Sequence, residues 1–438
     1  MFLTKRFYII LASLTLLAGF GYVFPQLFTG VKILLFIFAV MVVIDAVMLY
    51  HRRGISAKRS CSERFSNGDK NVVKISLESN YSFPVWLTII DEAPEVFQRR
   101  DISYKSSLAA MGHTVLRYTL TPVKRGVYSF GKIRCFTRTS IGLVERRYTL
   151  GDAKDVKVYP SYLMLNRYEL LAMSNNLTEM GIKRIRRVGN NTEFEQIKDY
   201  VKGDDYRSIN WKASARRNQL MVNVYRDERS QQIFSVIDKG RVMQQSFRGM
   251  TLLDYSINAS LVLSYVAMHR DDKAGLITFA DKIDTFVAPS HRTGQMQTLL
   301  EALYAQETNF GETDFSNLCV NVHKQVSKRS LFIIYTSFSG ITALNRQLAY
   351  LKLLSQWHRV LVVFFEDAEM NDYIRSPKRS MEEYYQHVIA EKFAYEKRLI
   401  VSTLRQYGIY SVLTTPDKLS IDVINKYCLL YTSPSPRD

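Results

Sequence analysis

The stretch FSVIDKGRVM, residues 234–243, has the pattern of a buried strand that ends in an aspartate. Apolar or small residues precede Asp238, and polar sequence containing a glycine follows it. In open α/β sheets, ligands bind beyond the carboxyl ends of the strands. We therefore expect an α/β domain in which Asp238 lies at the functional edge of the sheet, carrying either a site or the remains of one.

The sequence around this stretch supports the α/β assignment. From Ile233 onward, apolar strands alternate with longer amphipathic segments such as 254–270 and 343–358, which carry apolar residues at i, i+3 and i+4. The expected strands are IFSVID, AGLITFA, IDTFVAP, SLFIIYTSF, RVLVVFFE and IYSVLTT. This alternation predicts a mostly parallel sheet covered on both faces over residues 233–427. AGLITFADKIDTFVAP, 274–289, predicts one antiparallel pair.

Residues 61–160 follow a different period. In VVKISLES, 72–79, and VLRYTL, 115–120, apolar and polar residues alternate, which is typical of half-buried strands. Turn sequences such as SNGD, KRG and SIG separate the strands. The spacing predicts a compact all-β sandwich. The basic stretch that follows it, within 161–232, is expected to be a linker or surface helix leading into a polar segment.

The amino terminus, residues 1–60, predicts a two-helix transmembrane hairpin with a basic juxtamembrane segment. The runs 7–24 and 31–50 are apolar and of membrane-spanning length. Lys and Arg flank both outer ends, which places the remainder in the cytosol at the inner membrane of a bacterium. A signal peptide is the alternative for the first run. For Asp45, inside the second run, we prefer a packing or oligomer contact over a functional charge.

Composition narrows the partners only slightly. The formal net charge is +18, which would suit nucleic acid, an anionic membrane or an acidic partner. No nucleic-acid-binding motif accompanies the basic runs at 98–100 and 182–187, so lipid headgroups or solvent are the expected neighbours. The cysteines show no CxxC spacing, which favours a reducing compartment without a structural metal.

The last eleven residues, CLLYTSPSPRD, resemble nothing before them. They can be back-translated, codon by codon, into a transposon-end sequencing adapter. We expect that the natural reading is interrupted near Tyr427 and that 428–438 is an assembly artefact. The alternative is a genuine Pro/Ser-rich tail.

The most concentrated polar signal is GNNTEFEQIKDYVKGDDYRSINWKASARRNQLMVNVYRDE, residues 189–228. It resembles the signature of the family called domain of unknown function fifty-eight, E-F-x-x-(I/V)-(R/K)-x-Y-x-x-G-D-D-x-R-x-I-x-W-x-(A/S)-x-A-R. The matching positions are Glu193, Phe194, Ile197, Lys198, Tyr200, Gly203, Asp204, Asp205, Arg207, Ile209, Trp211, Ala213, Ala215 and Arg216. The resemblance implies two membrane spans, a β-sandwich and a von Willebrand factor A-like (Rossmann-like) domain.

The α/β part also resembles a von Willebrand factor A domain in the order of its elements. In that family a DxSxS loop, a later threonine and a later aspartate hold a divalent cation with oxygen ligands. Asp238 and Thr313 match, but Gly240 and Val242 replace the two hydroxyl residues and Ser337 replaces the second aspartate. We therefore expect a vestigial site that binds no metal, and no cofactor elsewhere.

The signature segment allows two interpretations. Its carboxylates and cations could form a metal or acid–base site, which would make the chain a metal-dependent hydrolase. We prefer a brace or docking surface in which opposite charges pair and Trp211 packs between sandwich and sheet. The residues expected to form it are Glu193, Glu195, Tyr200, Gly203, Asp204, Asp205, Arg207, Trp211, Lys212 and Arg216.

These patterns favour a membrane-anchored cytosolic interaction protein that is not an enzyme. The family resemblance implies as partners a MoxR-type AAA+ ATPase and other von Willebrand A proteins, in the assembly or maturation of client proteins. The rival expectations are the hydrolase using the 193–205 carboxylates and a membrane-tethered nucleic-acid binder, whose affinity would fall steeply with salt. The sequence names neither a client nor an oligomeric state.

Overall fold

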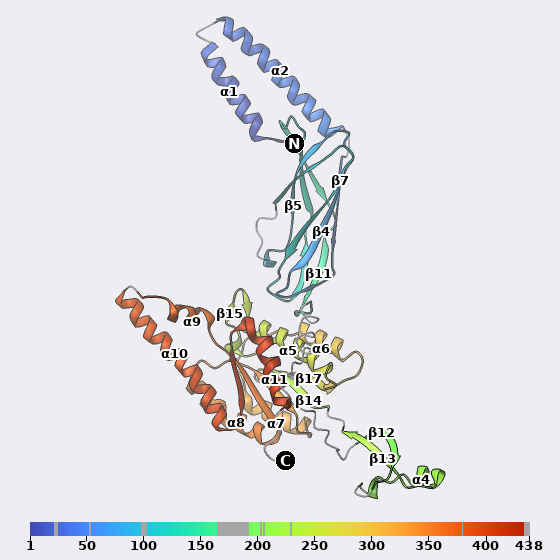
Figure 1. The fold of residues 1–438 in the computed structure, drawn as a ribbon. Helices are drawn as coiled ribbons and strands as arrows, with labels where there is room; N and C mark the ends of the chain where they lie inside the picture. The colour runs from blue at the N-terminus through green and yellow to red at the C-terminus, as the bar shows by residue number, and fades with distance from the viewer. Residues whose placement is uncertain are drawn as a thin grey trace. The chain divides into compact units, whose positions relative to one another are not determined.

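The chain divides into two compact units, Met1–Leu163 and Met164–Asp438 (Figure 1). The computed structural model describes residues 1–21, 25–51, 54–97, 103–163, 192–201, 204, 206–227, 230–378 and 380–432. The basic runs at 98–100 and 182–187, and most of the expected linker, lie outside the described residues.

The first unit begins with a helical hairpin. After the two-residue strand β1 (Phe2–Leu3), helices α1 (Lys5–Gly21) and α2 (Pro25–Tyr50) pack against each other. Within α2, the segment Phe28–Tyr50 has a mean hydropathy of 2.8 and is only 17% buried, so it is long and apolar enough to cross a membrane. It is the one such helix in the part of the chain that the structure describes. Membrane association is therefore supported, while a second span remains a prediction.

The rest of this unit is all β. Its strands are β2 (Ile55–Cys61), β3 (Arg64–Ser66), β4 (Asn71–Ser79), β5 (Val85–Asp91), β6 (Ser103–Leu108), β7 (His113–Leu120), β8 (Gly126–Phe130), β9 (Ile133–Arg138), β10 (Val144–Leu150) and β11 (Lys154–Tyr159). They form sheets ordered β1-β10-β9-β5-β6, β2-β4-β7 and β3-β11-β8 around one apolar core. We call β2–β11 the β unit. Its first strand starts at Ile55, inside the segment that we expected to be juxtamembrane.

The predicted alternation is confirmed in the β unit. Val73, Ile75 and Leu77 on β4 are fully buried, while the intervening residues are exposed or half-buried. Gly68 and Gly126, in two of the predicted turns, have φ values of 78° and 141°, which L side chains rarely adopt. The core is therefore built from the apolar positions of a period-two pattern.

Asp45 joins α2 to the β unit. Its carboxylate accepts hydrogen bonds from the backbone amides of Leu143 and Val144, both at 2.8 Å, and from the hydroxyl of Thr139. One turn further on, the carbonyl of Leu49 accepts a bond of 2.8 Å from the hydroxyl of Tyr81. The preferred packing role of Asp45 thus has a partner within the chain, and its burial is compensated by its donors.

The second unit contains the signature segment, which forms an antiparallel ribbon. Strand β12 (Thr192–Asp199) pairs with β13 (Met221–Asp227), and a 3₁₀ turn at Tyr206–Ser208 and helix α4 (Trp211–Arg217) lie between them in sequence. Asn210 caps α4 by accepting a bond of 3.0 Å from the Ala213 amide. Ser214 fastens the helix to β13 through the Met221 amide at 2.9 Å.

The main body of this unit is a six-stranded mixed sheet ordered β18-β17-β14-β19-β20-β21. All six predicted strands are present, as β14 (Gln232–Asp238), β17 (Lys273–Phe279), β18 (Ile283–Ser290), β19 (Leu331–Tyr335), β20 (Arg359–Phe365) and β21 (Tyr410–Thr414). Every pairing is parallel except β17 with β18, which is the predicted hairpin at one edge. A small pair, β15 (Ser246–Phe247) and β16 (Met250–Thr251), precedes the first long helix.

Helices cover both faces of this sheet (Figure 1). Helices α5 (Leu252–Met268), α6 (Gln295–Tyr304) and α11 (Leu419–Thr432) form one layer. Helices α7 (Phe315–Gln325), α8 (Ile341–Trp357) and α10 (Met381–Gln406) pack on the other face, over the core that includes Phe234, Phe332 and Phe364. The short α9 (Ala368–Arg375) connects β20 to α10. The α/β fold class is therefore confirmed at the level of a covered, mostly parallel sheet.

Replacing Asp45 with alanine tests the junction between α2 and the β unit. The substitution leaves two buried amides without their acceptor, so we expect a loss of about 2–4 kcal/mol in the free energy of unfolding. Urea unfolding of the detergent-solubilised chain can be followed by Trp86 fluorescence after Trp211 and Trp357 are changed to phenylalanine. Asp152→Ala, at an exposed position, should change stability by less than about 0.5 kcal/mol. Equal effects of the two substitutions would contradict the anchoring role.

Candidate functional site

The carboxylate of Asp238 lies at the carboxyl end of β14, and both of its oxygens are occupied. Oδ1 accepts hydrogen bonds of 2.7 Å from the Gly240 amide and from the Thr313 hydroxyl. Oδ2 accepts a bond of 2.7 Å from the Thr336 hydroxyl. Asp238 is only 1% exposed. Burial raises the pKa of its carboxyl, and the three hydrogen bonds partly oppose that increase because they favour the charged form.

Gly240 is required by the close approach of Thr313. A Cβ built on Gly240 would lie 1.8 Å from Thr313 Oγ1, although the backbone φ of −76° is ordinary for any residue. The threonine hydroxyl therefore occupies the space that a side chain at position 240 would need. A serine there, as in the DxSxS loop, cannot coexist with this arrangement.

The residues at this edge do not fit a divalent cation. Mg²⁺ takes near-octahedral oxygen coordination, but Gly240 and Val242 have no side-chain oxygen, and the Asp238 oxygens already face three protein donors. Ser337 is half-buried, and it is the neighbouring Thr336 that bonds to Asp238. Within the described residues, no group of three or more His, Cys, Asp or Glu side chains is placed to hold a metal.

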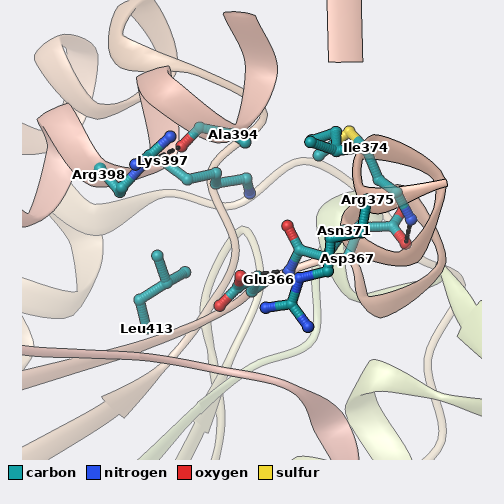
Figure 2. Close-up of a pocket in the computed structure, with 10 residues that line it drawn as sticks. Glu366, Asp367, Asn371, Ile374, Arg375, Ala394, Lys397, Arg398 and Leu413 are labelled. Atoms are coloured by element: carbon teal, nitrogen blue, oxygen red, sulfur yellow. Dashed lines mark hydrogen bonds between the residues drawn. The ribbon is translucent and has the colours of Figure 1, made fainter. Parts of the chain in front are cut away.

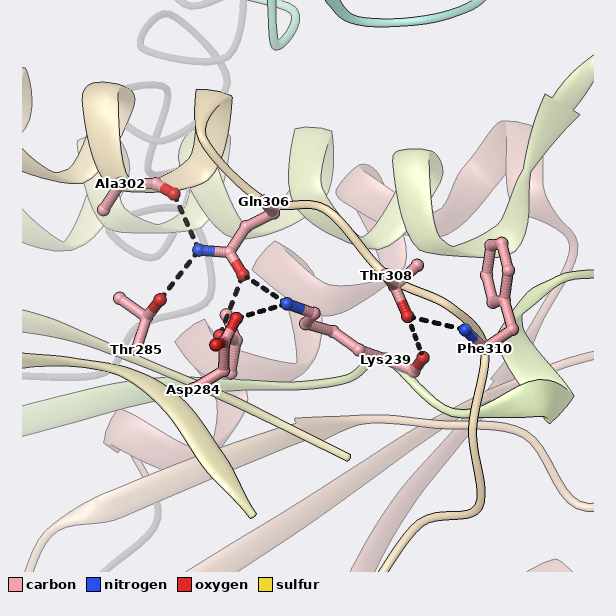
Figure 3. A network of polar contacts seen from close by, with 8 residues as sticks. Lys239, Asp284, Thr285, Ala302, Gln306, Thr308 and Phe310 are labelled. Atoms are coloured by element: carbon pink, nitrogen blue, oxygen red, sulfur yellow. Dashed lines mark hydrogen bonds and ion pairs between the residues drawn. The ribbon is translucent and has the colours of Figure 1, made fainter. Parts of the chain in front are cut away.

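A second polar network fixes the loop after Asp238 (Figure 3). The Lys239 amine, 4% exposed, contacts the Asp284 carboxylate and lies 3.2 Å from Gln306 Oε1. Gln306 also accepts a bond of 2.9 Å from Thr278 and donates one of 2.9 Å to Thr285. The carbonyl of Lys239 accepts a bond of 2.7 Å from the Thr308 hydroxyl. Lys239 thus ties the loop to β17, β18 and the segment after α6.

The loops above these networks, residues 241–242, 281–282, 311–314 and 337–339, form a surface that we call the sheet edge, in which Phe338 is buried. The Arg241 amide donates to the Gly311 carbonyl at 2.9 Å, which joins two of the loops. Arg241, Glu312 and Asp314 are exposed, and Val242 is 38% exposed. Hydrogen bonds therefore hold the loops of the sheet edge in place, and several of its exposed side chains are charged.

A cavity of about 360 Å³ opens between α9 and α10, beyond the ends of β20 and β21 (Figure 2). Lys397 lies in it, and its amine donates to the Phe338 carbonyl in the loop that follows Thr336. Burial lowers the pKa of Lys397. The lining residues are Glu366, Asp367, Met370, Asn371, Ile374, Arg375, Ala394, Lys397, Arg398 and Leu413. Sequence reasoning did not identify this cavity, because residues distant in the chain form it.

The signature residues are only partly described. Gly203 and Asp205 lie outside the described residues, as do the side chains of Glu193 and Glu195. Asp204 pairs with Lys198 at 2.9 Å and accepts a bond of 3.0 Å from the Val201 amide, so it closes a turn within the ribbon. These contacts lower the pKa of the Asp204 carboxyl, the hydrogen bond from Lys198 most of all.

The packing of Trp211 between sandwich and sheet stays a prediction, because the two units are described separately. The Trp211 side chain is 70% exposed, and that of Tyr206 is 68% exposed. Lys212 and Arg216, on the same short helix, are exposed as well, and Tyr200 is half-buried. Asn210 and Ser214 fasten α4 to β13, through Asn223 and Met221. Arg207 lies 5.8 Å from the Tyr206 ring centroid.

The most informative residue missed by the sequence is Thr336. The parallel register pairs Ile237 of β14 with Tyr335 of β19, so Thr336 follows directly where Asp238 ends the neighbouring strand. The sequence did offer one signal for Thr336, since its hydroxyl directly precedes Ser337, the position that the family comparison selected. Lys239 and Gln306 gave no such signal, because their contact depends on how β18 and α6 are placed.

Comparison with known proteins supports the family resemblance over part of the chain. The family described as Protein of unknown function DUF58 matches residues 196–372. The uncharacterized protein YeaD of Bacillus subtilis (strain 168) is 26% identical over 198 residues, covering 44% of this chain and 49% of that protein. The chain thus spans about half the length of the curated relative that it matches.

Similar solved structures are distant. The conserved hypothetical protein BatB from Bacteroides thetaiotaomicron is 11% identical, with a TM-score of 0.30, and the match covers 47% of this chain and 100% of that one. Proximal thread matrix protein 1 from the mussel byssus is 12% identical, with a TM-score of 0.26, and covers 45% of this chain and 47% of that one.

A double-mutant cycle tests the contact between Gly240 and Thr313. Gly240→Ala should lower the free energy of unfolding of the α/β domain by about 1–3 kcal/mol, because the new methyl group overlaps the threonine hydroxyl. In a Thr313→Ala background the same change should cost at least about 1 kcal/mol less. Urea unfolding followed by Trp357 fluorescence, with the other tryptophans replaced by phenylalanine, measures all four chains. Additive effects would contradict the steric explanation.

The pKa of Asp238 gives a pH-dependent prediction. Since the folded state raises this pKa above the ordinary 3.8, it binds the proton more tightly than the unfolded chain does. The stabilising contribution is therefore present below pH 3.8 and is lost as pH rises through the folded-state pKa. As pH falls from about 7 to about 4, the free energy of unfolding of the original chain should rise relative to that of the Asp238→Asn chain. A pH-independent difference would contradict a raised pKa.

Proposed function

We propose that this chain is a membrane-anchored interaction protein whose α/β domain is von Willebrand A-like and docks a protein partner without metal. In this proposal both helices of the hairpin are membrane spans and the bulk of the chain lies in the cytosol. The domain carries out no chemistry of its own. Its role is to present the sheet edge to a partner that acts on client proteins.

The observation that carries the proposal is that both carboxylate oxygens of Asp238 already accept hydrogen bonds from the protein. A metal-dependent surface needs oxygen ligands that are available to the cation. Here the Asp238 oxygens are satisfied by Thr313, Thr336 and the Gly240 amide. The satisfied network stabilises the loops instead, as complete buried polar networks do. What remains for recognition is the charged surface above it.

The von Willebrand A-like assignment is supported by topology. An aspartate ends the central strand β14. The next two strands of the same sheet, β17 and β18, form an antiparallel pair at its edge, and a threonine precedes α7. The sheet edge lies at the carboxyl ends of the parallel strands, where ligands of such sheets bind. Arg241 and Glu312 on this edge offer opposite charges, which favour a partner with a complementary charge pattern.

A MoxR-type AAA+ ATPase is the proposed partner, and this choice rests on the family resemblance alone. The exposed Trp211, Lys212 and Arg216 of the signature ribbon would add a second contact. Exposed tryptophan and arginine side chains are over-represented among residues that dominate binding energy. Among the signature residues that the structure describes, no contact favours the hydrolase: Asp204, one of its proposed carboxylates, closes a turn with Lys198.

Charge reversals at the sheet edge test the association, and a reversal at the opposite end of the sheet is the control. Arg241→Glu combined with Glu312→Arg should reduce co-purification of the full chain with a MoxR-type ATPase more than about tenfold, because like charges then face each other. Lys328→Glu, at an exposed position before the amino end of β19, is the matched control and should have no effect. Chelation of divalent ions by EDTA, with nucleotide omitted, should leave binding intact. Loss of binding in EDTA, or only in the control, would refute metal-free docking at this edge.

A further inference from the structure

The end of α2 is built into the β unit. Besides the Asp45 contacts, the Leu49 carbonyl accepts bonds from both Tyr81 and Arg146. Just before β2, a Cβ added to Gly54 would lie 2.2 Å from the Tyr81 ring. Because the helix is held by several buried contacts, its orientation relative to the β9–β10 turn is fixed.

This junction sets the depth of the β unit. Asp45 lies within the apolar segment Phe28–Tyr50, yet it is bonded to the β9–β10 turn. On the same stretch of helix, Val43, Ile44 and Val47 are 61%, 49% and 58% exposed. The part of the segment before Asp45 spans about 25 Å at 1.5 Å per residue, slightly less than a bilayer core of about 30 Å. With α2 spanning the bilayer as proposed, this length places the turn at the membrane surface.

An aromatic and basic face of the β unit begins at this turn. Strand pairing places Phe2, Glu145, Arg138 and Trp86 side by side across β1, β10, β9 and β5. Phe2 is 45% exposed and Trp86 is 55% exposed. Arg147, two residues along β10 on the same face, is exposed and lies 5.6 Å from the Phe2 ring centroid. These residues are continuous with the helical hairpin, because β1 leads directly into α1.

The charge of this face is positive. Lys5 and Arg6 begin α1, and Arg6 Nη1 lies 3.4 Å from the position of a Cβ built on Gly142, in the β9–β10 turn. Arg138 and Arg147 add two further cations, while Glu145 lies 3.6 Å from Arg138 Nε and offsets one of them. Cations near a bilayer surface are attracted to anionic headgroups, and aromatic side chains prefer the interface.

We infer that the Phe2–Arg138–Arg147–Trp86 face of the β unit lies on anionic lipid headgroups and fixes the tilt of the β unit at the membrane. This inference rests on the proposed membrane anchoring and adds a lipid-binding surface to it. The hairpin supplies the insertion, and the face supplies a preference for acidic lipid.

Trp86 provides a direct probe, because Trp211→Phe and Trp357→Phe leave it as the only tryptophan. The full chain is reconstituted into vesicles of phosphatidylcholine with phosphatidylglycerol, or of phosphatidylcholine alone, each with nitroxide lipid labelled at the headgroup or deep in the acyl chain. We expect quenching of Trp86 by the headgroup label more than by the deep label, and more in the mixed vesicles. Arg138→Gln with Arg147→Gln should reduce quenching in mixed vesicles to the level in phosphatidylcholine alone. The matched control, Lys74→Gln with Lys157→Gln at exposed positions on other sheets, should not.

The outcomes separate this inference from the proposed anchoring. A chain that resists alkaline carbonate extraction but whose Trp86 is quenched only by a water-soluble quencher would overturn the lipid contact and leave the anchoring intact, with a protein partner as the occupant of the face. A chain released by carbonate would overturn both. Equal quenching with and without phosphatidylglycerol would overturn the preference for acidic lipid.

Discussion

The saturation of Asp238 by Thr313, Thr336 and the Gly240 amide is the constraint on which the α/β domain depends. A carboxylate that is 1% exposed is costly to bury unless donors replace water. These donors come from the loop after β14, the turn before α7 and the end of β19. One side chain thus holds together three loops at the edge where such sheets bind their ligands.

The same constraint underlies the proposed preference of this edge for recognition over metal chemistry. Gly240 gives the Thr313 hydroxyl its space, so the feature that removes a metal ligand also completes the hydrogen-bond network. Lys239 extends the order to Asp284 and Gln306. Lys397 reaches the carbonyl of Phe338, two residues beyond Thr336, and so links the α9–α10 cavity to the same loop. Rigid loops with charged tops suit a docking surface, because little conformational entropy is lost on binding.

Asp45 follows the same physical rule at the other end of the chain. A carboxylate inside an apolar helix is normally expensive, and here two amides and a hydroxyl of the β9–β10 turn satisfy it. The result is that the end of α2 is bonded directly to the β unit. Movement of the helix would therefore be transmitted to the strands that follow it.

The sequence by itself determined the six strands of the α/β sheet, its antiparallel edge pair and the alternation in β4, because burial of one face or both imposes a readable period on apolar residues. It also identified Asp238 from the strand pattern that precedes it, and Thr313 through the resemblance to a von Willebrand factor A domain. The tertiary structure alone decided that Thr336 rather than Ser337 bonds to Asp238, and that Asp45 meets the β9–β10 turn. Those outcomes depend on which distant backbone groups approach within hydrogen-bond distance, and no local pattern of side chains encodes that distance.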